Sequence, residues 1–186
     1  MKVWTVQNKD VINKVKSEGI YQPDFSKSNY LQLNPNLGGL YKMILESFNK
    51  INSMNLPGVI YAFMRSDDEQ IYEIKDYEEF YSFVQNKRMV IDSLWQEFMK
   101  KDSLIMELNY EDNFNPIFVD INDFQFLMPP IIYLDPYREE DVERICVNIC
   151  SGKITQSVFP SYVIQVHLPY IKTENILNTY SMFDFD

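Results

Sequence analysis

Residues 37–51, LGGLYKMILESFNKI, and residues 59–65, VIYAFMR, decide the class of fold that this chain adopts. Apolar side chains recur in the first stretch every three or four positions, which is the period of an amphipathic helix. The second stretch is a short apolar run with two aromatic residues, which is typical of a buried strand. Asn55 to Gly58 separate the two stretches as a helix stop. Together they predict a helix that packs on a sheet.

The same patterns divide the rest of the chain. Alternating or apolar runs predict further strands at 1–7, 71–74, 104–110, 117–121, 161–168 and 175–183. Helical spacing, acidic starts and glycine stops predict further helices at 9–18, 76–84, 89–101 and 139–149. Prolines mark residues 20–36 as a loop and 128–138 as a connection or an edge segment.

These elements follow one another without a regular strand–helix–strand repeat, and neither a low-complexity stretch nor a linker interrupts them. A chain of 186 residues is most simply one domain. We therefore expect one α+β domain over residues 1–186, with a single mixed sheet and helices packed on it. The residues that we expect in its core share the apolar phase of their elements: Leu40, Ile44, Phe48, Tyr61, Phe63, Leu94, Phe98, Ile145 and Val163.

The net charge of the chain limits the classes of partner that it is expected to bind. It carries 27 acidic and 17 basic side chains, a formal net charge of −10. Proteins that bind nucleic acid non-specifically carry a basic face, so such binding is not expected. A local groove for a single nucleotide stays open, and a basic protein is the second kind of partner that an acidic surface suits. No apolar run approaches the roughly 18 residues of a membrane span, so no membrane partner is expected.

Two features predict a cytoplasmic protein of bacterial origin. The first residues, MKVWTVQ, lack the basic stretch and apolar core of a secretory signal. Cys146 and Cys150 lie four positions apart, which fits one helix face better than a disulfide framework. We expect two buried, reduced thiols rather than a metal site, because a zinc site needs four ligands and no second pair exists.

The residue types also exclude several classes of enzyme. Among five glycines only Gly38 and Gly39 are adjacent, so neither a P-loop nor a dinucleotide-binding fingerprint is present. His167 is the only histidine, and it follows the apolar strand residues 163–166. A histidine at such a place is more often a core or surface residue than a catalytic one. No metal-binding residues are assigned.

Four blocks of the sequence resemble the bacterial family called domain of unknown function 3841. The opening Val3-Trp4-Thr5-Val6-Gln7, with a helix and Gly19 after it, is similar to that family's first strand. Residues 58–63, 104–124 and 163–166 resemble its aromatic strand, its hydrophobic strand with an acidic turn, and its late strand. Tyr61 and Phe63 stand where the family usually has tryptophans. The family carries no assigned activity, so this resemblance implies none.

The layout is also similar to a degenerate ADP-ribosyltransferase. In those enzymes a polar motif at the end of the first strand holds the nicotinamide ribose, and a late strand carries a glutamate. Residues 4–7 and Gly19 match the first part in position, and Gln165 stands where the glutamate is expected. A glutamine can hydrogen-bond a ribose hydroxyl but cannot act as a base.

Two functions follow as hypotheses. The first is a nucleotide-binding or ADP-ribosyltransferase-like domain of a bacterium or phage, with nicotinamide dinucleotide as the candidate cofactor. In it, Trp4 stacks on the ligand, Thr5 and Gln7 bind its ribose or amide, Tyr61 or Phe63 walls the cleft, and Gln165 takes the catalytic position. It further requires the first strand to neighbour the strand of Gln165. The second is a non-enzymatic acidic interaction module, such as an immunity or antitoxin-like partner of a basic protein.

Overall fold

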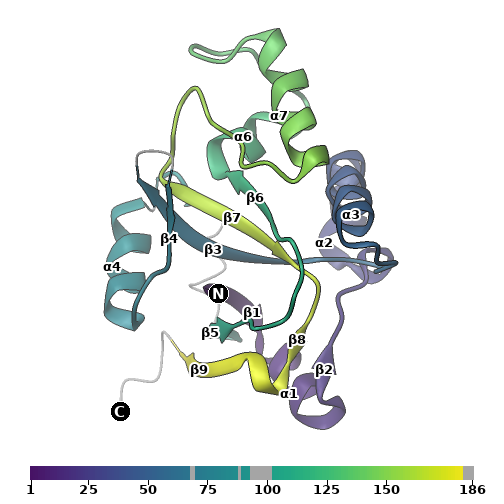
Figure 1. Ribbon diagram of the computed structural model, residues 1–186, viewed down its shortest axis with the longest axis vertical. Helices are drawn as coiled ribbons and strands as arrows, with labels where there is room; N and C mark the ends of the chain where they lie inside the picture. The colour runs from purple at the N-terminus through teal and green to yellow at the C-terminus, as the bar shows by residue number, and fades with distance from the viewer. Residues whose placement is uncertain (68–69, 88, 93–101, 182–186) are drawn as a thin grey trace.

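A seven-stranded sheet forms the centre of the computed structural model, which describes residues 1–67, 70–87, 89–92 and 102–181 (Figure 1). Its strand order is β6-β7-β3-β1-β5-β9, and β4 pairs with β3. The strands are β1 (Lys2–Asn8), β3 (Ile60–Asp67), β4 (Gln70–Tyr72), β5 (Ser103–Asn109), β6 (Ile117–Asp120), β7 (Val163–Leu168) and β9 (Ile176–Tyr180). A separate two-stranded sheet pairs β2 (Ile20–Tyr21) with β8 (Ile171–Lys172).

The α+β class, with one main sheet and helices packed on it, is confirmed. The pairings between the described strands are all antiparallel, where the sequence predicted a mixed sheet. Residues 104–110 and 117–121 do form strands, but β5 lies between β1 and β9 while β6 pairs with β7 at the other edge. Alternation of side chains identifies a strand, but it carries no information about which strand becomes its neighbour.

The helices are α1 (Lys9–Glu18), α2 (Asn29–Leu33), α3 (Gly38–Asn52), α4 (Tyr77–Lys87), α6 (Ile121–Phe126) and α7 (Glu139–Ser151). Local chemistry sets the ends of α1: the Asn8 side chain accepts a hydrogen bond from the backbone of Asp10, and Gly19 ends the helix with a φ of 79°. Residues 20–36, predicted as a loop, contain β2, α2 and two 3-10 turns, Phe25–Lys27 and Pro35–Leu37. These pieces are too short to show a period.

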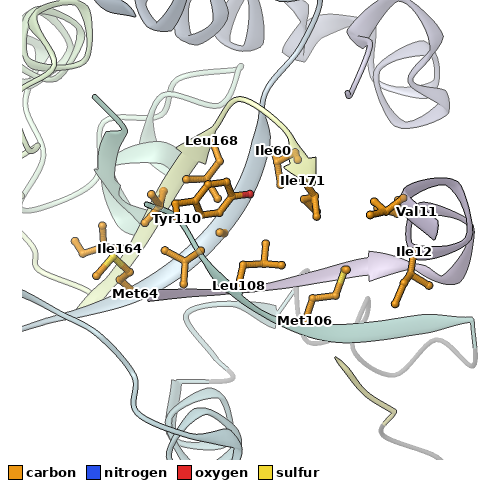
Figure 2. Close-up of a cluster of buried hydrophobic side chains, with 14 residues drawn as sticks. Val11, Ile12, Ile60, Met64, Met106, Leu108, Tyr110, Ile164, Leu168 and Ile171 are labelled. Carbon is orange, nitrogen blue, oxygen red and sulfur yellow. The ribbon is translucent and has the colours of Figure 1, made fainter. Parts of the chain in front are cut away.

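One face of the sheet packs on α1. Val3 of β1, Ala62 of β3 and Val166 of β7 are fully buried there, and Val15 of α1 is buried against them. Figure 2 shows this cluster between the strands and the helix. The alternation along each strand sends the neighbouring residues to the opposite face.

The opposite face packs on the other helices in two clusters. The first joins α3, α6 and α7 to β6, with Ile44, Phe48 and Ile145 fully buried. The second joins α4 to the middle of the sheet around Trp4. Burial of Leu40, Ile44, Phe48, Phe63, Ile145 and Val163 is confirmed. Tyr61 is half-buried as a residue, and Leu94 and Phe98, with most of the predicted helix 89–101, lie outside the described residues.

The two cysteines lie on α7 as free thiols, but the expected burial is wrong. Cys146 is half-buried and Cys150 is exposed. The buried stripe of α7 runs through Ile145 and Ile149, one position before each cysteine, so both thiols sit at the margin of that stripe. In the described ranges, no helix combines the length and the apolarity that crossing a bilayer requires.

Truncation of the α3 core position tests the packing of this layer. Phe48 is 0% exposed and its ring lies 6.2 Å from that of Phe114. We expect Phe48→Ala to lower the free energy of unfolding by about 3–5 kcal/mol in urea titrations, because the cavity that it leaves cannot be refilled. Leu33→Ala, at a side chain that is 81% exposed, should change it by less than about 0.5 kcal/mol. Equal, small losses for both variants would contradict the helix phase.

Candidate functional site

The pairing of β3 with β7 brings together three of the residues that the sequence singled out, Tyr61, Phe63 and Gln165. Tyr61 lies opposite His167, and Phe63 lies opposite Gln165. Residues directly opposite in an antiparallel pair project to the same face of the sheet, as do residues two apart on one strand. Tyr61, Gln165 and His167 therefore share one face, and we call this region the β3–β7 seam.

Unpaired polar atoms gather along this seam. Within the part of the chain that the structure describes, three buried atoms of the seam lack a hydrogen-bond partner in the protein: Arg65 Nε, Gln165 Oε1 and His167 Nε2. The buried Tyr61 hydroxyl lies beside that of Tyr41. Most buried polar atoms of a native protein are paired, because an unpaired one costs about 1–3 kcal/mol. The seam is therefore the place where this fold departs from ordinary polar pairing.

His167 is held neutral near the end of the seam that lies away from Arg65. Its Nδ1 lies 3.2 Å from the carbonyl oxygen of Ile117, so Nδ1 carries the proton and donates it. Complete burial lowers the pKa of His167 to about 3. The ring meets that of Tyr61 edge-on at 4.8 Å between centroids. Burial, with Tyr41 beside it, also raises the pKa of the Tyr61 hydroxyl well above its usual value. Both groups are therefore uncharged at neutral pH.

Trp4 is a core residue rather than the wall of a cleft. Its ring is fully buried and stacks on Phe80 at 4.8 Å with 12° between the ring planes. Its Nε1 donates a hydrogen bond of 3.0 Å to the carbonyl oxygen of Ile74. Phe80 of α4 and Tyr180 of β9 both lie against this ring, so it has no free face on which a ligand could stack.

Thr5 and Gln7 lie on the other face of the sheet, because side chains alternate along β1. The Thr5 hydroxyl donates to the carbonyl oxygen of Tyr61 at 2.6 Å, and Gln7 Nε2 donates to the Thr5 hydroxyl at 2.9 Å. The strand of Gln165 is also not the neighbour of β1, since β3 lies between them. The single cleft expected from Trp4, Thr5, Gln7 and Gln165 is therefore not formed.

A pocket opens at one end of the seam, between β3, β4 and α4. Its volume is about 440 Å³, and its lining residues are Arg65, Ser66, Asp67, Tyr72, Phe83, Lys87 and Tyr162. Arg65 follows Tyr61 and Phe63 on the same face of β3 and lies opposite Val163 of β7. The pocket is thus a continuation of the row of residues that holds Gln165.

Each cation of the pocket is held against a tyrosine ring. The Arg65 guanidinium carbon lies 5.7 Å from the centroid of the Tyr72 ring, and Lys87 Nζ lies 4.6 Å from that of Tyr162. Glu79 forms an ion pair with Arg65, with 3.2 Å between Glu79 Oε1 and Arg65 Nη1. Two cations and one carboxylate, Asp67, line the pocket, although the whole chain carries a charge of −10.

The backbone at Tyr162 is in an unusual conformation. Its φ of 64° lies in the left-handed region, which non-glycine residues seldom adopt. The Tyr162 carbonyl oxygen accepts a hydrogen bond of 3.1 Å from the backbone of Ser66. This bond ties the segment before β7 to β3 and places the Tyr162 ring beside Lys87. Such conformations persist where the surroundings hold them, and they cluster at functional sites.

Sequence reasoning missed this pocket. Arg65 and Tyr162 stand at or next to the ends of predicted strands, and Lys87 lies between the predicted helices 76–84 and 89–101, so no period links them. One signal was present: Lys87 belongs to one of the two adjacent basic pairs of the chain, 87–88 and 100–101. Basic residues and tyrosines near the ends of predicted elements were the features of the sequence that could have indicated this pocket.

The buried carboxylates beside the seam have structural partners. Asp120 accepts hydrogen bonds from the backbone of Asn122 and of Ser161, and Asp123 accepts one from the Tyr137 hydroxyl at 2.8 Å. Burial raises the pKa of both carboxyls. Across the described residues, no group of three or more histidine, cysteine, aspartate or glutamate side chains is placed to hold a metal ion.

Comparison with known proteins adds no relative: no family model, no curated protein and no solved structure matches the chain. The seam and its pocket are therefore interpreted from their own geometry.

The buried His167 predicts a specific acid sensitivity. As the pH falls through about 6.5, the unfolded chain binds a proton on this histidine, while the folded chain does not do so until about pH 3. Stability is therefore unaffected by His167 above about pH 6.5 and falls by about 1.4 kcal/mol per pH unit below it. Between about pH 7.5 and about pH 4.5 we expect the parent to lose about 2.7 kcal/mol more than His167→Gln.

Urea titrations of both proteins across this pH range measure the difference. Comparing the parent with the variant cancels the contributions of groups far from the substitution, including exposed carboxylates. Parallel curves for the two proteins would show that His167 titrates in the folded state as it does in the unfolded chain.

Proposed function

We propose that this protein binds a small anionic ligand with a planar ring, of the nucleotide class, in the pocket at the Arg65 end of the β3–β7 seam. The observation that carries the proposal is the pairing of Arg65 with Tyr72 and of Lys87 with Tyr162 within one cavity. Guanidinium and ammonium groups bind phosphate oxygens, and tyrosine rings stack on a planar base.

The size and charge of the pocket support this class of ligand. A volume of about 440 Å³ lies within the range of roughly 300–1,000 Å³ that small-molecule sites occupy. Arg65 and Lys87 both line this pocket, with Asp67 beside them and Glu79 paired with Arg65, so Lys87 is the cation that we expect to bind the anionic group. Arg65 is already oriented by Glu79, which lowers the entropy cost of gripping a phosphate.

Nicotinamide dinucleotide remains the candidate cofactor within this proposal. Gln165 lies two residues along β7 from Val163, the partner of Arg65, and its Oε1 is buried without a partner. A ligand that extended from the pocket along the seam would meet this amide first. We also propose, as part of the same hypothesis, that the chain is related to ADP-ribosyltransferases and to the domain of unknown function 3841 family. We propose binding, with no reaction assigned.

Ligand binding is testable by thermal shift and calorimetry with nicotinamide dinucleotide, its fragments and mononucleotides. A ligand at about a hundredfold excess over its dissociation constant should stabilise the folded protein by about 2.7 kcal/mol. Lys87→Gln removes one charged contact, worth about 1.5–3 kcal/mol, so the dissociation constant of the ligand should rise roughly 10–150-fold. Lys42→Gln is the matched control, because Lys42 is an exposed lysine on α3.

A third variant separates the pocket from the site that the sequence predicted. Gln165→Ala should weaken a dinucleotide and leave a mononucleotide unchanged, because Gln165 lies beyond the pocket along the seam. Near-ultraviolet circular dichroism confirms that each variant is folded before binding is measured. The proposal fails if no nucleotide binds, or if Lys87→Gln and Lys42→Gln behave alike. If Gln165→Ala abolished all binding and Lys87→Gln did not, the ligand would bind in the interior of the seam and not in the pocket.

A further inference from the structure

The connection between α6 and α7 exposes four consecutive apolar side chains. Ile131, Ile132, Tyr133 and Leu134 are 36%, 60%, 53% and 67% exposed. Single exposed apolar residues are ordinary on a protein surface, but a contiguous run of large ones marks an interaction site or an aggregation hazard. We call residues 131–134 the apolar apex.

The apex is anchored on both sides, and the Tyr133 ring lies edge-on to the core residue Phe126 at 6.2 Å between centroids. The Asn36 side chain donates to the carbonyl oxygen of Pro129 at 3.1 Å, before the apex. After it, the Tyr137 backbone donates to the carbonyl oxygen of Leu134 at 2.9 Å, and the Tyr137 ring stacks on Phe126 at 4.2 Å. Prolines 129, 130 and 136 restrict the backbone between these anchors. A segment ordered in this way loses little conformational entropy when it binds.

An acidic rim borders the apex. Asp135 follows it directly, and Glu139, Glu140 and Glu143 lie exposed on the first turns of α7, which begins next to the apex (Figure 1). Arg138 is the cation of this segment, and it is paired with Asp135. The rim therefore carries net negative charge beside the exposed apolar side chains.

We propose that the apex and its acidic rim form a docking surface for a protein with an apolar recess bordered by lysine and arginine residues. Apolar contact supplies the affinity in such an interface, and complementary charge sets the partner and the rate of encounter. The same charges disfavour two other occupants. A second copy of this chain would place one acidic rim against another, and an anionic membrane surface would repel the rim.

This surface is separate from the nucleotide-class pocket, since one precedes α7 and the other lies between β3, β4 and α4 (Figure 1). Neither proposal depends on the other. Variants of the apex leave Lys87 and Tyr162 untouched, so failure of one proposal says nothing of the other.

Synthetic peptides provide a defined probe of the charge and apolar requirements. A helical peptide built from leucine and lysine should bind the full chain in calorimetry, and a peptide of leucine and glutamate should not. An alanine–lysine peptide should bind at least tenfold more weakly than the leucine–lysine one, because it lacks the large apolar side chains. Raising the salt from about 0.1 M to about 0.5 M should weaken binding severalfold, since the rim is exposed.

Two pairs of matched variants locate the contact. Leu134→Ser should raise the dissociation constant of the leucine–lysine peptide about tenfold or more. Leu177→Ser, at an exposed leucine on β9 (48% exposed), should leave it unchanged. Glu140→Gln should reduce the salt dependence and slow association, whereas Glu18→Gln on α1 should do neither.

Three outcomes overturn the proposal. Equal binding by the parent and Leu134→Ser would remove the apex from the contact. Leu134-dependent binding to vesicles of phosphatidylcholine and phosphatidylglycerol would make it a membrane anchor. Leu134-dependent dimerisation in sedimentation experiments would make it a contact between copies of this chain.

Discussion

The main sheet is joined at its centre through a narrow junction between β1 and β3, where Trp4 lies opposite Phe63. On one side of this junction β3 pairs with β7 over six residues, and on the other β1 pairs with β5 over seven. The junction itself has a single paired position, and the Thr5 hydroxyl supplements it by donating to the Tyr61 carbonyl oxygen. The apolar clusters around α1 and around Trp4 span both halves of the sheet and, with this junction, set their relative position.

This constraint explains why the polar residues of β1 are structural. Trp4 fills the space between the junction and α4, and its indole nitrogen is satisfied by Ile74. Thr5 replaces a ladder hydrogen bond with a side-chain one, and Gln7 in turn donates to Thr5. The side chains of Trp4, Thr5 and Gln7 are thus engaged in contacts within the protein. The pocket proposed for a ligand lies instead on the β3–β7 half.

The β3–β7 half carries an energetic cost that the rest of the fold must offset. Three buried polar atoms lie along it without a partner in the protein, on Arg65, Gln165 and His167, and a buried polar atom left unpaired costs about 1–3 kcal/mol. The apolar clusters on both sides of the sheet provide the burial that makes this tolerable. At one end the same row of residues reaches a pocket lined by Arg65, Lys87 and aromatic rings, while the connection before α7 presents exposed apolar side chains beside acidic ones. The molecule thus displays two surfaces of opposite character.

The local elements were determined by the sequence itself. The ends of α1 at Asn8 and Gly19, and the buried stripe of α3 through Ile44 and Phe48, follow from hydrogen bonds and apolar spacing within a few residues. The tertiary structure alone decided that β3 separates β1 from β7, and that Arg65, Lys87 and Tyr162 meet in one pocket. These contacts join residues far apart in the chain. Their formation depends on which strands pair and in what register, and neither is encoded in the period of any single segment.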